Sequence, residues 1–368
     1  LALIVAGCFL VALIVTAAAG FIEGMRNGLT LTASDSNVIL LSAGSEASLE
    51  RSQIDSQTAG VAAAAIKGIR TRAGIQYVSP EIHMSNLLYL TRDSETGLPA
   101  MMRGVLPEAF LVHPQVRITE GRAPGVGEIL VGEMAHKRMG ASAETLRVGR
   151  TLWFDNREWR ISGRFEAPNS VMESEVWAPL TELQIATRQD NFLSCVIITL
   201  GDAAFEDVET FAMERLYLEL TAVRETDYYR SLYVYFRPIR AMIWTTAILI
   251  SFGALLGGLN TFYAAFSARV AEFGALQTLG YSRRAIALSM TVETGLTSAI
   301  GALLAVGVCL IALDGAGIRF SMGAVRLQMN GTAVGIGLAA GAFIGLAGAA
   351  LPAARYLSLS ITDALKAS

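Results

Sequence analysis

A short charged segment, ARVAEFGALQTLGYSRR, lies between two long apolar runs of the chain. Arg269 and Glu272 stand three positions apart in it, and apolar residues follow at helical spacing. This pattern predicts a short amphipathic helix at a membrane face. Gly280 is placed to end that helix in the left-handed conformation, and Ser282 to cap the next helix. A polar helix between two spans suits docking of another protein; its candidate docking residues are Arg269, Glu272, Phe273, Leu276, Gly280 and Arg283.

A single carboxylate, Glu293, lies inside the apolar run that follows this segment. A charge within a membrane span is costly, so Glu293 is a candidate for an intramembrane functional residue. The alternative is a structural residue near the inner interface, paired with Arg283, Arg284 or a backbone donor to fix the helix register. Two helical turns, roughly 11 Å, separate it from the start of the run, and both interpretations stay open.

The sequence contains no motif that predicts catalysis or cofactor binding. There is no GxxxxGK[ST] loop for phosphate and no GxSxG nucleophile turn. The carboxylates before the second apolar run are scattered and nominate no acid–base pair. We therefore expect no enzyme activity, no cofactor and no metal site on this chain. The three histidines lack metal-binding spacing and are expected to be surface or loop residues: His83, His113 and His136.

The composition indicates a membrane protein. The 368 residues are 53% hydrophobic and 17% charged, with a mean hydropathy of +0.47, whereas soluble proteins carry about 25% charged residues. The net charge of -3 and the lack of a basic cluster argue against nucleic acid as a partner. Three distant cysteines, Cys8, Cys195 and Cys309, predict no disulfide framework.

Four apolar runs are long enough to cross a bilayer. The chain begins at Leu1 within the first run, which we interpret as a membrane helix whose cytoplasmic lead-in is missing; a signal-peptide core is the alternative. The expected order is a helix at 1–20, an outer domain at 21–238, a helix at 239–266, the docking segment at 267–282, a helix at 283–313, a short outer loop at 314–331, a helix at 332–352 and a cytoplasmic tail at 353–368.

The outer domain, 21–238, is predicted to be α+β and to divide into two lobes. Short runs of apolar and β-branched residues predict strands, and the stretches between them predict helices. Residues 45–56 and 92–98 are expected to be loops. The predicted strands are Val38–Leu41, Glu128–Val131, Thr151–Phe154, Trp159–Ile161 and Cys195–Leu200, and the predicted helices are Ser56–Ala73, Gly132–Met139, Leu180–Gln189 and Ala203–Leu216.

The distribution of basic residues predicts the orientation. The docking segment carries Arg269, Arg283 and Arg284, and the tail carries Arg355 and Lys366. The positive-inside rule places both in the cytoplasm and the large domain outside. Two arginines in the 314–331 loop run against this rule, Arg319 and Arg326.

These patterns together resemble the FtsX-like permeases of the MacB/LolCE class of ABC transporters, also called type VII. The family motif R-x-x-E-[FI]-G-x-L-x-x-[LI]-G matches Arg269, Glu272, Phe273, Gly274, Leu276, Leu279 and Gly280, followed by Arg283, Ile286, Glu293 and Gly301. The tail resembles the family ending at Pro352, Ala353, Ala364 and Leu365, and departs from it at Tyr356 and Ile361.

The outer domain resembles the MacB-type periplasmic core. Residues 104–107 (GVLP), 120–122 (EGR) and 127–132 (GEILVG) match elements of that core in order. Residues 159–165 (WRISGRF) and 176–180 (VWAPL) match the two strands that follow. The resemblance covers nearly the whole chain.

The resemblance implies a division of labour between subunits. Arg269–Gly280 would be a coupling helix that docks on a separate ABC ATPase subunit, which would bind ATP and Mg. Two permease copies, or this chain and a sister permease, would form a dimer in a bacterial inner membrane. Such mechanotransmission systems act in efflux or in lipoprotein and lipid handling, with a periplasmic adaptor or lipoprotein as a further partner. The alternative is an FtsX-like regulator that activates a periplasmic cell-wall hydrolase.

Overall fold

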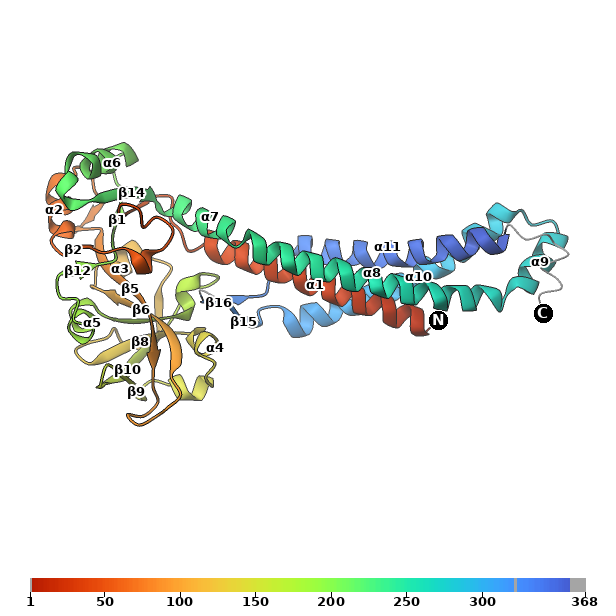
Figure 1. Cartoon of the computed structure of the whole chain (residues 1–368), viewed down its shortest axis with the longest axis horizontal. Helices are drawn as coiled ribbons and strands as arrows, with labels where there is room; N and C mark the ends of the chain where they lie inside the picture. Colours follow the sequence, from red (N-terminus) through yellow and green to blue (C-terminus); the bar gives the residue numbers. More distant parts are fainter. Residues whose placement is uncertain (1, 321–322, 358–368) are drawn as a thin grey trace. The chain divides into compact units, whose positions relative to one another are not determined.

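The computed structural model describes residues 2–320 and 323–357 and divides into two compact units (Figure 1). The helical unit comprises the chain up to Gly24, Arg237–Ala316, and the chain from Leu327 onward. The α+β unit comprises Met25–Phe236 and Gly317–Arg326. The fold class expected from the sequence, four membrane helices with a large α+β domain between the first two, is confirmed.

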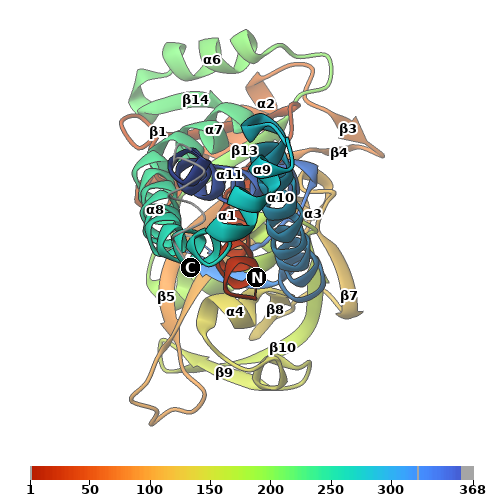
Figure 2. The ribbon, with the colours of Figure 1, turned by 90° about the vertical axis from the view of Figure 1, so that its right-hand side faces the viewer.

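The helical unit contains four helices that are long and apolar enough to cross a membrane. They are α1 (Ala2–Thr30), α8 (Arg237–Ser267), α10 (Arg283–Val308, continued by a π-helical turn to Leu313) and α11 (Gly331–Leu357); the short helix α9 (Val270–Thr278) connects α8 to α10. Figure 2, which looks along these helices, shows α1 among α8, α10 and α11.

Small residues bring the long helices into backbone contact, as is common where helices pack in lipid. A Cβ atom placed on Gly301 of α10 would lie 2.5 Å from the carbonyl oxygen of Val5 in α1. A Cβ atom on Gly341 of α11 would lie 2.6 Å from the Cβ atom of Ala302. These glycines therefore set how closely α10 approaches α1 and α11.

Two boundaries in the helical unit differ from those predicted. Helix α1 continues ten residues past position 20, to Thr30, because Met25 and Leu29 are buried in an apolar cluster of the α+β unit. Helix α11 continues through Pro352, which was predicted to end it, up to Leu357. Packing holds this last turn, since Ala353 is buried and the Tyr356 hydroxyl donates to the carbonyl of Tyr263 at 3.3 Å. Lys366, Ala364 and Leu365 of the predicted tail lie outside the described residues.

A ten-stranded mixed sheet forms the α+β unit, in the order β14-β1-β13-β5-β6-β11-β8-β10-β7, with β9 paired to β10. The strands are β1 (Asn37–Ser42), β5 (Val78–Leu88), β6 (Leu98–Val105), β7 (Arg117–Gly121), β8 (Glu128–Gly132), β9 (Thr151–Phe154), β10 (Arg157–Glu166), β11 (Glu175–Pro179), β13 (Cys195–Thr199) and β14 (Leu220–Arg224). Three short two-stranded pairs add β2 (Ile54–Asp55) with β12 (Phe192–Leu193), β3 (Thr71–Arg72) with β4 (Ile75–Gln76), and β15 (Gly317–Phe320) with β16 (Gly323–Arg326).

Helices cover this sheet: α2 (Thr58–Ala65), α3 (Ala109–Val112), α4 (Ala135–Met139), α5 (Leu180–Thr187), α6 (Phe205–Glu214) and α7 (Glu225–Tyr235). Fully buried apolar side chains, including Trp159 and Trp177, fill its core. The strand β5 is shared by two parts of the sheet, because its first residues pair with β13 and its later ones with β6. The second part consists of β5, β6, β11, β8, β10, β7 and β9. An antiparallel bridge between Tyr89, directly after β5, and Trp153 of β9 joins its first and last strands, so this part of the sheet closes on itself.

One predicted helix of the α+β unit is too long, and the predicted outer loop contains a hairpin. The helix predicted at Ser56–Ala73 ends at Ala65, because Gly68 adopts a φ of +82° and lies against the backbone of Ala203, where a Cβ atom would be 2.6 Å from the nitrogen. The predicted outer loop at 314–331 contains the β15–β16 hairpin, which belongs to the α+β unit. Arg326 of this hairpin binds the carboxylate of Glu173 at 2.9 and 3.1 Å, a structural role that accounts for a basic residue on the outer side.

The glycine contacts generate a prediction about the helical unit. Gly301→Ala should destabilise it by about 1–3 kcal/mol, because the added methyl group meets the Val5 carbonyl. Gly307→Ala in the same helix has open space around it and is the matched control. Thermal unfolding in detergent measures both variants, and equal melting temperatures would contradict close packing at Gly301.

Candidate functional site

The docking segment folds as the short helix α9, and its ends follow the predicted chemistry. Gly280 has a φ of +93°, and its N–H donates to the carbonyl of Gln277 at 3.1 Å. The hydroxyl of Ser282 accepts from the N–H of Ala285 at 3.3 Å and caps α10. The chain therefore reverses direction within a few residues between α9 and α10.

The apolar residues of α9 divide into an anchored and an exposed group. Phe273 is only 3% exposed and belongs to an apolar cluster with Phe266 and Ile286. Leu276 is 36% exposed and Leu279 is 76% exposed. Phe273 therefore fixes α9 to the long helices, while the side chains of Leu276 and Leu279 remain exposed.

Arg269 connects α9 to the carboxylate inside α10. Its Nη1 donates to both carboxylate oxygens of Glu293, at 3.0 and 2.8 Å, and its Nε donates to Glu272 at 3.1 Å. The hydrogen bonds that Arg269 donates to Glu293, and then to Glu272, raise the pKa of Arg269. The partner of Glu293 is thus Arg269, which the sequence did not predict, because only the fold of α9 over the first turns of α10 brings the two together.

Arg283, the remaining candidate, makes a second connection between these helices. Its Nε donates to the side-chain oxygen of Gln277 at 3.3 Å. Arg283 stands at the first position of α10, and Gln277 lies in the last turn of α9. Polar contacts therefore join α9 to α10 at two places, Arg269–Glu293 and Arg283–Gln277.

A double-mutant cycle tests the bond between α9 and α10. Arg269→Ala and Glu293→Ala should couple by roughly 1 kcal/mol, since the bidentate contact is lost in either single variant. The cycle of Arg269→Ala with Glu272→Ala is the control, because the Glu272 side chain is 64% exposed. Melting temperatures in lipid nanodiscs give both values, and a coupling no larger than that of the control would contradict the proposed bond.

A second polar cluster is buried in the α+β unit, where the sequence predicted no grouping of carboxylates. Arg103 of β6 donates from Nε and Nη2 to Glu175 of β11 at 2.7 and 2.8 Å, and from Nη1 to Glu81 of β5 at 2.7 Å. Trp177 donates to Glu175 at 2.9 Å. The cluster joins three neighbouring strands, and only the register of β5 against β6 could have revealed it.

Two histidines belong to this cluster. His83 is buried within β5, which contradicts its prediction as a surface or loop residue, whereas His113 lies in the loop after α3, as predicted, but is buried. The Nε2 atoms of His83 and His113 lie 3.0 and 2.9 Å from the carboxylate of Glu81. Burial would raise the pKa of Glu81, but Arg103 and His113 hold it well below its ordinary value of 4.5. The contribution of Glu81 to stability is therefore present above pH 4.5 and is lost as the pH falls below it.

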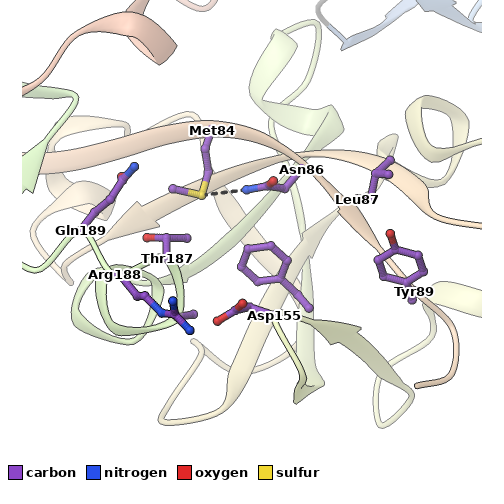
Figure 3. Close-up of a pocket in the computed structure, with 10 residues that line it drawn as sticks. Met84, Asn86, Leu87, Tyr89, Asp155, Thr187, Arg188 and Gln189 are labelled. Carbon is purple, nitrogen blue, oxygen red and sulfur yellow. Dashed lines mark hydrogen bonds between the residues drawn. The ribbon is translucent and has the colours of Figure 1, made fainter. Parts of the chain in front are cut away.

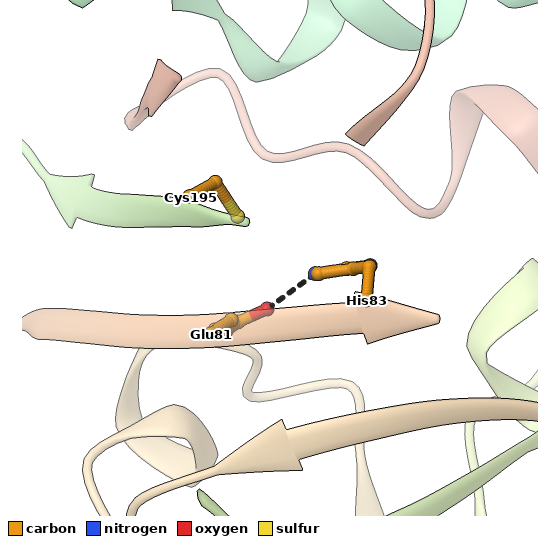
Figure 4. Close-up of side chains that lie close together, drawn as sticks. All are labelled: Glu81, His83 and Cys195. Carbon is orange, nitrogen blue, oxygen red and sulfur yellow. Dashed lines mark hydrogen bonds and ion pairs between the residues drawn. The ribbon is translucent and has the colours of Figure 1, made fainter. Parts of the chain in front are cut away.

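Three side chains of this cluster could be mistaken for a metal site. The ligand atoms of Glu81, His83 and Cys195 all lie within 4.8 Å of one another, across β5 and β13 (Figure 4). However, Nη1 of Arg103 already forms an ion pair with the Glu81 carboxylate at 2.7 Å, and the positive charge of this guanidinium would repel a cation. Burial also raises the pKa of the Cys195 thiol well above its ordinary value. These residues suit an ion-pair network better than a metal ion.

The buried cluster generates a stability prediction. Arg103→Met should destabilise the α+β unit by about 3–5 kcal/mol, because Glu81 and Glu175 remain buried without their positive partner. Arg122→Met is the control, since Arg122 pairs with Glu128 but its side chain is 67% exposed. Chemical unfolding at pH 7 compares them, and similar losses in the two variants would show that the cluster contributes little.

Comparisons with known proteins cover both units. A family described as the MacB-like periplasmic core domain matches residues 1–213, and one described as the FtsX-like permease C-terminal matches residues 244–361. No curated protein matches the chain.

Two solved structures are similar to part of this chain at low identity. The periplasmic region of MacB from Actinobacillus actinomycetemcomitans is 13% identical over 55% of this chain and 94% of that chain, with a TM-score of 0.40. A domain of a putative permease protein from Porphyromonas gingivalis is 14% identical over 51% of this chain and 87% of that chain, with a TM-score of 0.35.

Proposed function

Because this chain belongs to the MacB/LolCE class of FtsX-like ABC transporter permeases, we propose that α9 is the coupling helix that docks on a separate ATPase subunit. The observation that carries this proposal is the combination of an anchored and an exposed side of α9. Phe273 and Arg269 fasten the helix to the long helices, while Leu276 and Leu279 stay exposed. An apolar exposed side with charged neighbours is typical of a protein contact.

Movement of α9 would reach the other helices through contacts within the helical unit. Arg269 would transmit it to α10 through Glu293, and Gly301 would transmit it from α10 to α1 through the backbone at Val5. Helix α1 continues without a break into residues that belong to the α+β unit. This route supports mechanotransmission: ATP and Mg bind to the partner subunit, and this chain converts their effect into movement of its outer domain.

The second permease copy, or a sister permease, is expected to cover α8. Only Ala247, Phe262 and Phe266 of this helix are buried among the described residues, whereas α10 has eight buried residues. Large apolar side chains such as Phe252 and Ile248 are exposed along α8. In a lipid bilayer such a surface suits either lipid or a matching helix, and the two-fold pairing of permeases would supply the latter.

The site of action would be the outer face of a bacterial inner membrane, with the α+β unit in the periplasm. A domain built on a ten-stranded sheet offers a large surface for cargo or for an adaptor, which favours efflux or lipoprotein and lipid handling over regulation of a cell-wall hydrolase. Recovery of an adaptor or a lipoprotein with the purified complex would support transport, and recovery of a hydrolase would support regulation.

A change of the exposed side of α9 should abolish ATPase binding. The double variant Glu272→Arg, Leu276→Asp reverses a charge and places a carboxylate in the apolar contact, so the ATPase subunit should no longer co-purify and ATP hydrolysis in lipid should fall at least tenfold. The control variant Glu95→Arg, Leu216→Asp makes the same changes at exposed positions of the α+β unit. Retention of the ATPase by the α9 variant would contradict docking at α9.

A further inference from the structure

The central strand β5 pairs with different strands along its two edges. Along one edge, its residues from Ile82 to Leu88 pair with β6 in a continuous antiparallel register. Along the other edge, residues 78–81 pair with β13, and Tyr89, directly after the strand, pairs with Trp153. Among the described residues, Ile82 to Leu88 pair with no strand on this second edge.

We call the part of this edge between the β13 pairing and the Trp153 pairing the gap. Because the backbone N–H and C=O groups of successive residues point to alternate edges of a strand, the hydrogen bonds at its two ends identify which groups face it. The N–H of His83 donates to the Ser194 hydroxyl at 2.9 Å, and the N–H of Tyr89 donates to the Trp153 carbonyl at 2.8 Å, both on the edge away from β6. Backbone groups of alternate residues point to the same edge, and the register against β6 shows no shift. The N–H and C=O groups of Ser85 and Leu87 therefore face the gap.

A groove of about 660 Å³ is lined on this side by Met84, Asn86, Leu87 and Tyr89 (Figure 3). One end of the gap is bounded by Asp155, where the chain turns from β9 into β10, and the other by Ser194, where β12 leads into β13. Ala186 and Thr187 at the end of α5, and Arg188 directly after it, line another part of the groove. Ser85 is exposed and Leu87 is 47% exposed, so solvent reaches this edge.

We propose that this groove binds an extended polypeptide segment of a partner protein, which adds to β5 as a short antiparallel strand at Ser85 and Leu87. Within the described part of the chain these four backbone groups pair with no strand, and free groups on an exposed strand edge are the recognition chemistry that such a segment requires. Both neighbours along this edge, β13 and the residues of β9 at Trp153, run antiparallel to β5. The added segment would lie between these two neighbours along the same edge of β5 and run in the same direction as they do.

The dimensions and the lining fit about five residues. The six-residue interval from His83 to Tyr89 corresponds to roughly 20 Å of strand. Met84 and Phe154 offer apolar contacts in the groove, so the segment is expected to carry apolar side chains at alternate positions. Arg188 and Asp155 offer charges of opposite sign and form no ion pair within the part of the chain that the structure describes. This site is independent of the coupling function proposed for α9.

The first experiment uses the full chain in lipid nanodiscs and a random heptapeptide library displayed on phage. Peptides enriched over empty nanodiscs should bind wild type and Leu87→Ala equally. They should bind Leu87→Pro at least tenfold more weakly, because proline removes the N–H group that faces the gap and leaves the β6 ladder intact. Failure to enrich any peptide, or equal binding to Leu87→Pro, would overturn the proposal.

The second experiment keeps the test decisive even if Leu87→Pro folds poorly. An enriched peptide is N-methylated at every second residue in the two possible phases, and binding to wild type is measured. One phase should abolish binding and the other should not, because only alternate N–H groups of an added strand pair with β5. In hydrogen exchange, Ser85 and Leu87 amides should exchange faster than those of Met84 and Asn86, and the peptide should protect them. Equal effects of both phases would show binding by side chains alone and would rule out strand addition.

Discussion

A carboxylate within an apolar membrane helix is costly unless a partner compensates its charge, and this constraint bears on how α9 lies against α10. Glu293 of α10 obtains that partner from Arg269, which stands just before α9 and donates to both carboxylate oxygens. The ion pair therefore holds α9 against the first turns of α10. Phe273 adds an apolar anchor on the same side, so the exposed leucines of α9 remain on the side where a partner subunit could bind.

A comparable constraint operates in the α+β unit, where β5 belongs to two parts of one sheet. Arg103, Glu81 and Glu175 cross three strands at the place where the pairing of β5 changes from β13 to β6. Buried ion pairs contribute little net stability compared with apolar packing, but removing one partner is costly. We infer that this cluster fixes the register of β5, and with it the position of the unpaired edge at Ser85 and Leu87.

The sequence predicted the features that depend on local chemistry. Long apolar runs predicted the four membrane helices, and Gly280 and Ser282 predicted the ends of α9 and α10. Features that depend on distant pairing were missed. The strands β5 and β6 interrupt their apolar pattern with Glu81, His83 and Arg103, which look solvent-exposed until the register places His83 opposite Arg103 and the Arg103 guanidinium reaches Glu81. Likewise, Arg269 could be matched to Glu293 only once the turn between α9 and α10 was known.

The most direct measurement is the distance between the two units during ATP hydrolysis. The three native cysteines are buried, so spin labels can be placed on Leu216→Cys in the α+β unit and Ile311→Cys in the helical unit, which are 81% and 89% exposed. With the ATPase subunit, ATP and vanadate, we predict a change in this distance in the otherwise wild-type complex. Glu293→Gln should retain the ATPase and lose most of that change. A full distance change in Glu293→Gln would contradict transmission through the Arg269–Glu293 pair.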